Sequence, residues 1–278
     1  MKETKFDAEN LVALERYPID DLESSTGQAF LNQCRSELAT SGCCNLNGFL
    51  HPQAVSALVT ESNAWEADAY EKSIHRNPYH GEDDPSLPPN HPARQFNLYK
   101  ASQLAYDQIP ASSLLDRFYQ WEGLTRFIAA VLDLKTLYRM ADPFQAVNIV
   151  WQYPGGNSSA HFDHGDFTIT LLLQAPEAGG DFEFVPNIRS RDNECYDDVQ
   201  RVLEGDRSRV CTAEREPGTL TFFLGRNSLH WVTPVTSGRR ATAIFCYSEE
   251  PGLIGKDQEN LQVYGPRIEP LLGHTQPR

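Results

Sequence analysis

Residues 146–174 read AVNIVWQYPGGNSSAHFDHGDFTITLLLQ. Two strand-like runs, 146–153 and 167–174, flank a connection that opens with Pro154, Gly155 and Gly156. The runs are rich in β-branched and aromatic residues, and Pro and Gly mark a turn between them. The segment therefore predicts two strands, and their connection carries most of its polar side chains.

The same pattern continues on both sides of this segment. Further strand-like runs occur at 43–50, 181–185, 219–224, 230–235 and 241–247. Many short strands with regular turn signals are typical of a sandwich or barrel. Residues 187–216 interrupt them with a charged insert that is compatible with a helix.

The N-terminal part predicts helices. Ser24, Ser25 and Thr26 are cap-type residues before a helical pattern that should end near Gly42, and Pro52 suits the first turn of a second helix. A third helical region covers 112–132. Helices before strands indicate an α+β fold, and we expect one domain over residues 1–278: a mainly helical part (1–140), a strand core (141–252) and a C-terminal tail (253–278).

Residues 73–94, SIHRNPYHGEDDPSLPPNHPAR, have a different composition. Four prolines after Asp84 oppose regular structure, and we expect a long loop. Long loops inside compact domains are often functional, so the segment is either a surface loop or a lid over a site.

Charge and composition exclude several classes of function. The chain has 278 residues with 24 basic and 38 acidic side chains, a formal net charge of −14. Phosphate backbones and anionic membrane surfaces would repel such a chain. It has no run of about 20 apolar residues and no apolar signal segment near Met1. Its six cysteines form no CxxC pair, so we expect reduced thiols and a cytoplasmic protein.

The polar connection contains a metal-ligand pattern. His161 and Asp163 are two residues apart, so in an extended chain they point to the same side. His230, on a distant strand, would complete a set of two nitrogens and one oxygen, which suits a non-haem Fe(II) site with open positions. A second pair, His164 and Asp166, has the same spacing and is the rival register.

A basic residue downstream supports the first register. Arg240 lies ten residues after His230 and starts another strand, with Thr242 on the same face. A guanidinium and a hydroxyl together can bind a carboxylate. Strand alternation turns the adjacent Arg239 to the opposite face.

These motifs resemble the Fe(II)/2-oxoglutarate-dependent dioxygenases. The segments HFDHGDFTITLLLQAPEAGGDFEFVP and GTLTFFLGRNSLHWVTPVTSGRRATAIF are similar to the branch that contains free-amino-acid hydroxylases and amino-acid radical halogenases. The resemblance implies a double-stranded β-helix (jelly roll, cupin-like) with N-terminal flanking helices. It also implies that His161, Asp163 and His230 hold Fe(II), and that Arg240 binds the distal carboxylate of 2-oxoglutarate with support from Thr242. The family often has Arg after the distal histidine, where this chain has Trp231.

We therefore expect an enzyme that uses Fe(II), 2-oxoglutarate and O₂ to hydroxylate an unactivated C–H of a small polar substrate, with a free amino acid or derivative favoured. The metal centre would be the only catalytic group. Arg94 is the candidate for a substrate carboxylate, and Asp142, Asn148 and Trp151 are further substrate candidates. Asp142, which precedes Pro143, has a turn-capping role as its alternative.

Four alternatives share parts of this pattern. Desaturation or cyclisation can occur on the same scaffold. A radical halogenase needs Gly or Ala at position 163, because halide takes the place of the carboxylate. A metal-binding cupin that does not use 2-oxoglutarate would not need Arg240, and a non-enzymatic jelly roll would not need the metal ligands.

Overall fold

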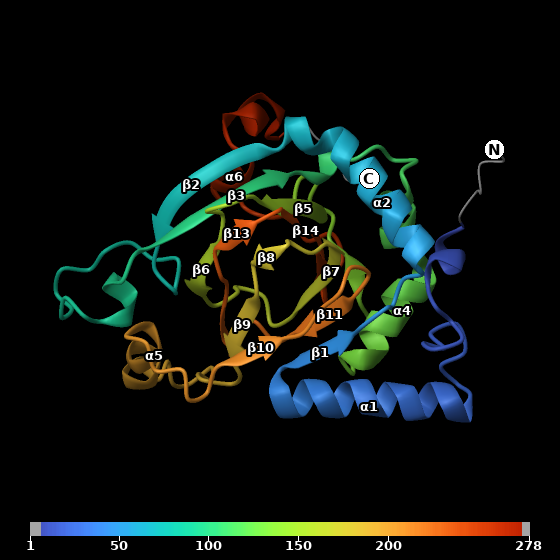
Figure 1. The fold of residues 1–278 in the computed structure, drawn as a ribbon, viewed down its shortest axis with the longest axis horizontal. Coiled ribbons are helices and arrows are strands. Elements are labelled where there is room, and N and C mark those ends of the chain that lie inside the picture. The colour runs from blue at the N-terminus through green and yellow to red at the C-terminus, as the bar shows by residue number, and fades with distance from the viewer. Residues whose placement is uncertain (1–6, 274–278) are drawn as a thin grey trace.

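The protein, seen in a computed structural model that describes residues 7–273, is built around two antiparallel sheets that curve into a barrel (Figure 1). The larger sheet has the order β1-β11-β7-β14-β5-β3-β2, and the smaller has the order β10-β9-β12-β6. Strands of the larger sheet are β1 (Cys43–Leu46), β11 (Leu220–Phe223), β7 (Thr168–Gln174), β14 (Arg240–Phe245), β5 (Val147–Gln152), β3 (Asn97–Leu104) and β2 (Tyr70–Arg76). Strands of the smaller sheet are β10 (Cys211–Ala213), β9 (Phe182–Val185), β12 (Leu229–Val232) and β6 (Ser158–His161). Two short pairs complete the strands: β13 (Val235–Ser237) with β8 (Ala178–Gly179), and β15 (Tyr247–Ser248) with β4 (Tyr138–Arg139).

Alternation along the central strand β14 separates the core from the barrel interior. Ala243 and Phe245 belong to the main hydrophobic core, whereas Arg240, Thr242 and Ile244 line the interior cavity. Because successive side chains of a strand point to opposite faces, one short strand supplies both surfaces. Neighbouring β5 and β7 pair with β14 on its two sides.

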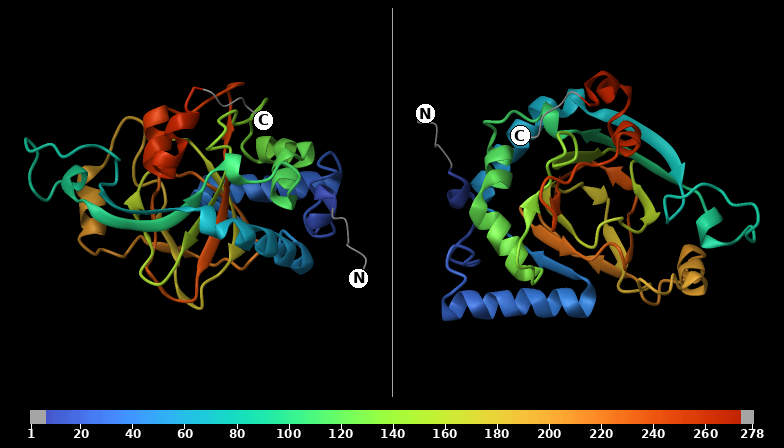
Figure 2. Two further views of the ribbon diagram at one scale, coloured as in Figure 1. Left: turned by 90° about the horizontal axis from the view of Figure 1, so that it is seen from above. Right: turned by 180° about the vertical axis from the view of Figure 1, so that it is seen from behind.

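Four helices cover the outer face of the larger sheet (Figures 1 and 2). They are α1 (Ser25–Ser41), α2 (Pro52–Trp65), α3 (Leu114–Gln120) and α4 (Glu122–Val131). Aromatic pairs join helix to strand: the rings of Phe127 and Phe222 lie 5.5 Å apart, and those of Phe118 and Phe245 lie 5.8 Å apart. Burying each such ring stabilises the fold by about 1.5–3 kcal/mol.

The sequence correctly predicts the fold class and the start and end of α1. The Ser24 side chain accepts a hydrogen bond from the backbone N–H of Gly27 at 3.0 Å, and Gly42 ends the helix with φ 68°. A helix that ends in this way needs a residue in the left-handed conformation. Glycine adopts this conformation without strain because it has no Cβ.

Other expectations need correction. The helical region 112–132 is two helices, separated at Trp121, which is extended. Residues 73–76 belong to the strand β2 and not to the loop. Neither β2 nor β3 is among the predicted strands. β2 is polar and largely exposed, so it lacks the apolar alternation of a half-buried strand.

Two further segments contain regular structure, and one of them, the insert, is compatible with a helix by its sequence. The insert contains α5 (Tyr196–Leu203) and β10, and the C-terminal tail contains α6 (Asp257–Tyr264). Both helices are short, and tertiary packing rather than helix propensity stabilises helices of this length. Within residues 7–273, no helix combines the length and the apolar character that a bilayer crossing requires.

Candidate metal centre

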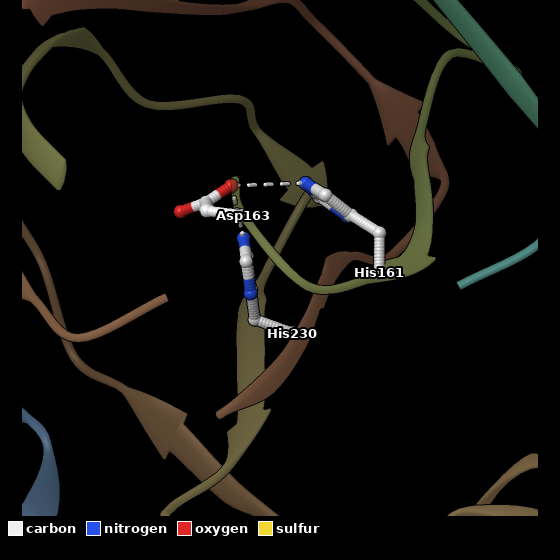
Figure 3. A group of neighbouring side chains, drawn as sticks. All are labelled: His161, Asp163 and His230. Atoms are coloured by element: carbon white, nitrogen blue, oxygen red, sulfur yellow. Dashed lines mark ion pairs between the residues drawn. The ribbon is translucent and has the colours of Figure 1, made fainter. Parts of the chain in front are cut away.

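Three side chains converge inside the barrel, two from strands of the smaller sheet and one from the turn after β6 (Figure 3). His161 is the last residue of β6, Asp163 lies in the turn after it, and His230 lies on β12 directly opposite His161. The two imidazole rings are 4.1 Å apart between centroids. Asp163 Oδ1 lies 3.6 Å from His161 Nε2 and 3.4 Å from His230 Nε2, and one ligand atom from each residue lies within 4.8 Å of the others.

Backbone contacts orient both imidazoles toward the centre of this group. The Nδ1 atom of His161 lies 2.8 Å from the Ser159 carbonyl, and that of His230 lies 3.0 Å from the Ser228 carbonyl. A carbonyl only accepts, so each Nδ1 carries the proton and each Nε2 faces Asp163. Metal-binding histidines are held in this same way by a hydrogen bond at the other ring nitrogen.

The electrostatics of the group fit a cation between the three ligand atoms. Burial, the Arg76 charge and His230 lower the pKa of His161 well below its usual value, so its Nε2 carries a lone pair at neutral pH. Burial opposes ionisation of Asp163, but the neighbouring His230 and a hydrogen bond from Thr168 Oγ1 at 2.7 Å hold its pKa well below the usual range. A lone pair facing a carboxylate oxygen is repulsive, and a metal ion removes that repulsion.

Gly225 lets the Asp163 carboxylate occupy its position. The Asp163 backbone N–H donates to the Gly225 carbonyl at 3.0 Å, and a Cβ built on Gly225 would lie 1.9 Å from Asp163 Oδ2. No side chain larger than hydrogen fits at position 225 without moving the carboxylate.

The rival register does not form a comparable group. Asp166 is engaged by Arg226 at 2.6 Å and by Arg191 at 2.8 Å. His164 packs against His80, with the ring centroids 5.0 Å apart. Of the described residues, only the earlier pair joins a group of three or more potential ligands.

The predicted carboxylate clamp opens into the same cavity as the metal group. This cavity has a volume of about 270 Å³ and is lined by both sheets. Arg240 is buried, with Nη1 donating to Gln152 Oε1 at 3.1 Å, and burial and then the Arg215 charge lower its pKa well below the usual value. Thr242 Oγ1 is buried without a hydrogen-bond partner in the described part of the chain. A bound carboxylate would satisfy both groups.

Arg239 points the other way, as alternation predicts. Its guanidinium contacts Glu66, Gln174 Oε1 at 3.0 Å and Asn63 Oδ1 at 2.6 Å. None of these residues lines the cavity. Arg239 is therefore a matched control for Arg240.

The structure places the other substrate candidates away from the cavity wall. The Arg94 guanidinium binds Asp83, with Nε donating at 2.8 Å. Asp142 caps a turn: its carboxylate accepts backbone hydrogen bonds from residues 144, 145 and 255, which agrees with its predicted alternative role. Asn148 Oδ1 accepts from Gln103 Nε2 at 3.0 Å, and Trp151 is completely buried in the main core.

Several cavity residues were missing from the sequence-based set. They are Lys72, Arg76, Tyr99, Gln103, Gln152, Thr170, Arg215 and Thr221. On β5 the cavity face carries Val150 and Gln152. Alternation along the strand therefore places Gln152 on the cavity wall and turns the predicted Trp151 to the opposite face. Lys72 and Arg76 share one face of β2. The sequence analysis placed residues 73–76 of this strand in the loop and predicted no element for residues 70–72.

The start of the predicted loop lies against the metal group. The Phe162 backbone N–H donates to the Pro78 carbonyl at 2.9 Å, and His80 Nε2 lies 2.9 Å from the Phe162 carbonyl. The His80 and His161 ring centroids are 5.5 Å apart. Farther along, the loop packs against α5, with the His91 and Tyr196 rings 4.4 Å apart, at the side of the barrel away from α2 (Figure 1).

The fold is similar to that of several solved structures. An oxidoreductase of the 2OG-Fe(II) oxygenase family from Burkholderia pseudomallei matches with a TM-score of 0.51 and 14% identity, covering 80% of this chain and 92% of that one. AviO1 from Streptomyces viridochromogenes Tue57 matches with a TM-score of 0.54 and 17% identity, covering 80% and 96%. The non-haem α-ketoglutarate-dependent epimerase SnoN from nogalamycin biosynthesis matches with a TM-score of 0.54 and 13% identity, covering 80% and 83%. These matches confirm the predicted double-stranded β-helix.

No curated protein matches this sequence. A family model, described as Halogenase D, matches residues 91–259, which is more than half of the chain. The matched region includes both strands that carry the histidines of the metal group, together with Arg240. It confirms the resemblance drawn from the sequence motifs, and the chain belongs to the Halogenase D family.

Proposed function

We propose that this protein is an Fe(II)- and 2-oxoglutarate-dependent oxygenase that hydroxylates an unactivated C–H of a small polar substrate, with O₂ as the second co-substrate. One observation carries the proposal: the two-histidine, one-carboxylate group lines the same cavity as the buried Arg240, which forms no ion pair with an acid within residues 7–273. A metal site without 2-oxoglutarate would not need a buried guanidinium at that place.

One set of residues would bind the iron, and a second set orients the side chains of the first. His161, Asp163 and His230 would hold the iron and leave its remaining positions open, which is the ligand set of non-haem iron oxygenases. When bound, iron with 2-oxoglutarate and O₂ supplies the oxidising chemistry. Ser159 and Ser228 fix the imidazole orientation through their carbonyls, and Thr168 holds the carboxylate.

Arg240 and Thr242 would bind the distal carboxylate of 2-oxoglutarate. A buried guanidinium without an acidic partner is costly, and pairing with a carboxylate offsets that cost. Arg215 adds a second cation on this side of the cavity, where Nη1 donates to Thr170 Oγ1 at 3.4 Å. The arrangement therefore favours a co-substrate with two negative charges.

Asp163 favours hydroxylation over halogenation. Halide would need the position that the Asp163 carboxylate occupies, and hydrogen bonding to Thr168 and the close approach to Gly225 hold the carboxylate there. The family's description as a halogenase therefore does not extend to the reaction that we propose for this chain.

The cavity volume of about 270 Å³ suits a small substrate beside the co-substrate, and we propose a free amino acid or derivative. The test is succinate formation from 2-oxoglutarate by the anaerobically loaded Fe(II) protein after addition of O₂, in the presence of ascorbate and a panel of small polar molecules. Mass spectrometry should find a product one oxygen atom heavier than its substrate. His161→Ala should abolish both signals, whereas Arg239→Ala should keep them.

Three results would defeat parts of the proposal. Absence of 2-oxoglutarate binding to the metal-loaded protein would reject this class of enzyme. A product two hydrogens lighter than its substrate would indicate desaturation or cyclisation. A chlorinated product from the unaltered protein would reject hydroxylation in favour of halogenation.

A further inference from the structure

The cavity wall carries an excess of positive charge inside an acidic protein. Its cations are Lys72, Arg76, Arg215 and Arg240, and its single acid is Asp163, which belongs to the metal group. The whole chain has a formal net charge of −14. Even so, none of the four cations forms an ion pair with an acid in residues 7–273.

The four cations form two separate pairs. Arg240 on β14 and Arg215, just after β10, lie close enough for the charge of Arg215 to lower the pKa of Arg240. Lys72 and Arg76 lie on one face of β2, where burial and then the Arg76 charge lower the pKa of Lys72 to about 8. Strands β5 and β3 separate β14 from β2, a distance of about 14 Å along the sheet.

Arg76 lies beside the metal group. Its Nε donates to Ser159 Oγ and its Nη2 to Ser158 Oγ, both at 3.1 Å, and these serines belong to the strand that ends at His161. The guanidinium carbon lies 4.4 Å from the centroid of the Tyr99 ring. Arg76 lines the cavity, and among the described contacts no hydrogen bond uses its Nη1, so the guanidinium keeps one donor for a ligand.

Lys72 extends this positive surface. Its Nζ lies 5.6 Å from the Tyr99 ring centroid, so the two cations flank one aromatic ring. Both side chains are half-buried. Unpaired charge held partly out of water is costly, and a bound anion offsets that cost.

We propose that Lys72 and Arg76 bind a carboxylate of the primary substrate, and that this substrate is a net anion, such as an amino acid with an acidic side chain or a dicarboxylic acid. A cationic amino acid would meet two cations and no free acid on this wall. The inference rests on the proposed function, because it assigns Arg240 and Arg215 to 2-oxoglutarate and leaves the β2 pair for the substrate.

The experiment compares acids with their amides. Protein loaded anaerobically with Fe(II) and saturated with 2-oxoglutarate is titrated calorimetrically with glutamate and glutamine, aspartate and asparagine, and lysine. We expect at least one acid to bind about 10–100-fold more tightly than its amide, since hydrogen bonds to charged groups are the strong ones. Lysine should bind more weakly than either acid.

Variants separate the two subsites. Arg76→Gln and Lys72→Gln should each weaken binding of the preferred acid at least about tenfold and leave the Kd of 2-oxoglutarate within about twofold. Arg240→Gln should weaken 2-oxoglutarate binding instead. Lys100→Gln is the matched control, because Lys100 lies on the same hairpin but not on the cavity wall, and it should change neither affinity.

The outcomes keep this inference distinct from the proposed function. If 2-oxoglutarate does not bind, the proposed function fails, and this inference fails with it. If 2-oxoglutarate binds but no acid exceeds its amide, only the anion subsite is wrong. If Arg76→Gln weakens 2-oxoglutarate as much as Arg240→Gln does, the β2 pair serves the co-substrate and the inference is overturned.

Discussion

Replacing Gly225 with alanine should remove the third metal ligand without touching any ligand residue. The added Cβ would lie 1.9 Å from Asp163 Oδ2 and 2.6 Å from its Cγ, whereas ordinary contact begins near 3.4 Å. The carboxylate must therefore move by about 1.5 Å, the difference between those distances. Metal–ligand distances tolerate deviations of only about 0.2 Å. The required movement is several times larger, so Asp163 can no longer bind the ion together with both histidines.

We expect Gly225→Ala to weaken metal binding at least about tenfold, comparable to the loss of a supporting group around a metal site. The assay is anaerobic competition for Fe(II) against a chromophoric chelator, with thermal unfolding measured in parallel to verify the fold. Gly165→Ala is the matched control, because a Cβ there meets nothing closer than 3.5 Å and the glycine lies in the same turn as Asp163.

The double variant tests the cause. If the alanine acts only by displacing the carboxylate, adding Gly225→Ala to Asp163→Ala should change the metal affinity little, because the two effects share one interaction. A Gly225→Ala protein that keeps its metal affinity within about twofold would refute the proposed ligand position of Asp163. Equal losses in Gly225→Ala and Gly165→Ala would show a general disturbance of the turn instead.

Further predictions concern the ligand register, the clamp, metal linkage and the loop. His161→Ala should abolish Fe(II) binding in the chelator assay and His164→Ala should not; the reverse result would establish the rival register. Arg240→Gln should raise the Kd of 2-oxoglutarate by at least about tenfold, against little change for Arg239→Gln, as calorimetry would show. Saturating Fe(II) at about 100 times its Kd should stabilise the fold by about 2.7 kcal/mol in chemical denaturation, and an unchanged midpoint would argue against a specific site. Substrate should slow limited proteolysis within residues 77–94, the part of the predicted loop that follows β2, since this loop contacts the metal turn through the Pro78 carbonyl; unchanged cleavage would count against a lid.

The local signals in the sequence were sufficient for the parts of the protein that depend on short-range geometry. Ser24 and Gly42 bound a helix because capping depends on the adjacent turn alone. His161 and Asp163 face one side because extended backbone repeats every two residues. Arg240 and Thr242 share a face for the same reason, and the motif spacing connected all of them to a family.

Long-range packing decided the remaining features of the site. His230 meets His161 only because β12 pairs with β6, a register that the sequence does not encode locally. The polar strand β2 has no apolar alternation, so only its pairing with β3 reveals a strand and places Arg76 beside the metal group. Arg94 matched the chemistry of a carboxylate ligand equally well, but Asp83 binds its guanidinium. Residue type predicts what a side chain can bind, whereas the neighbours brought by tertiary pairing determine whether its donors stay free.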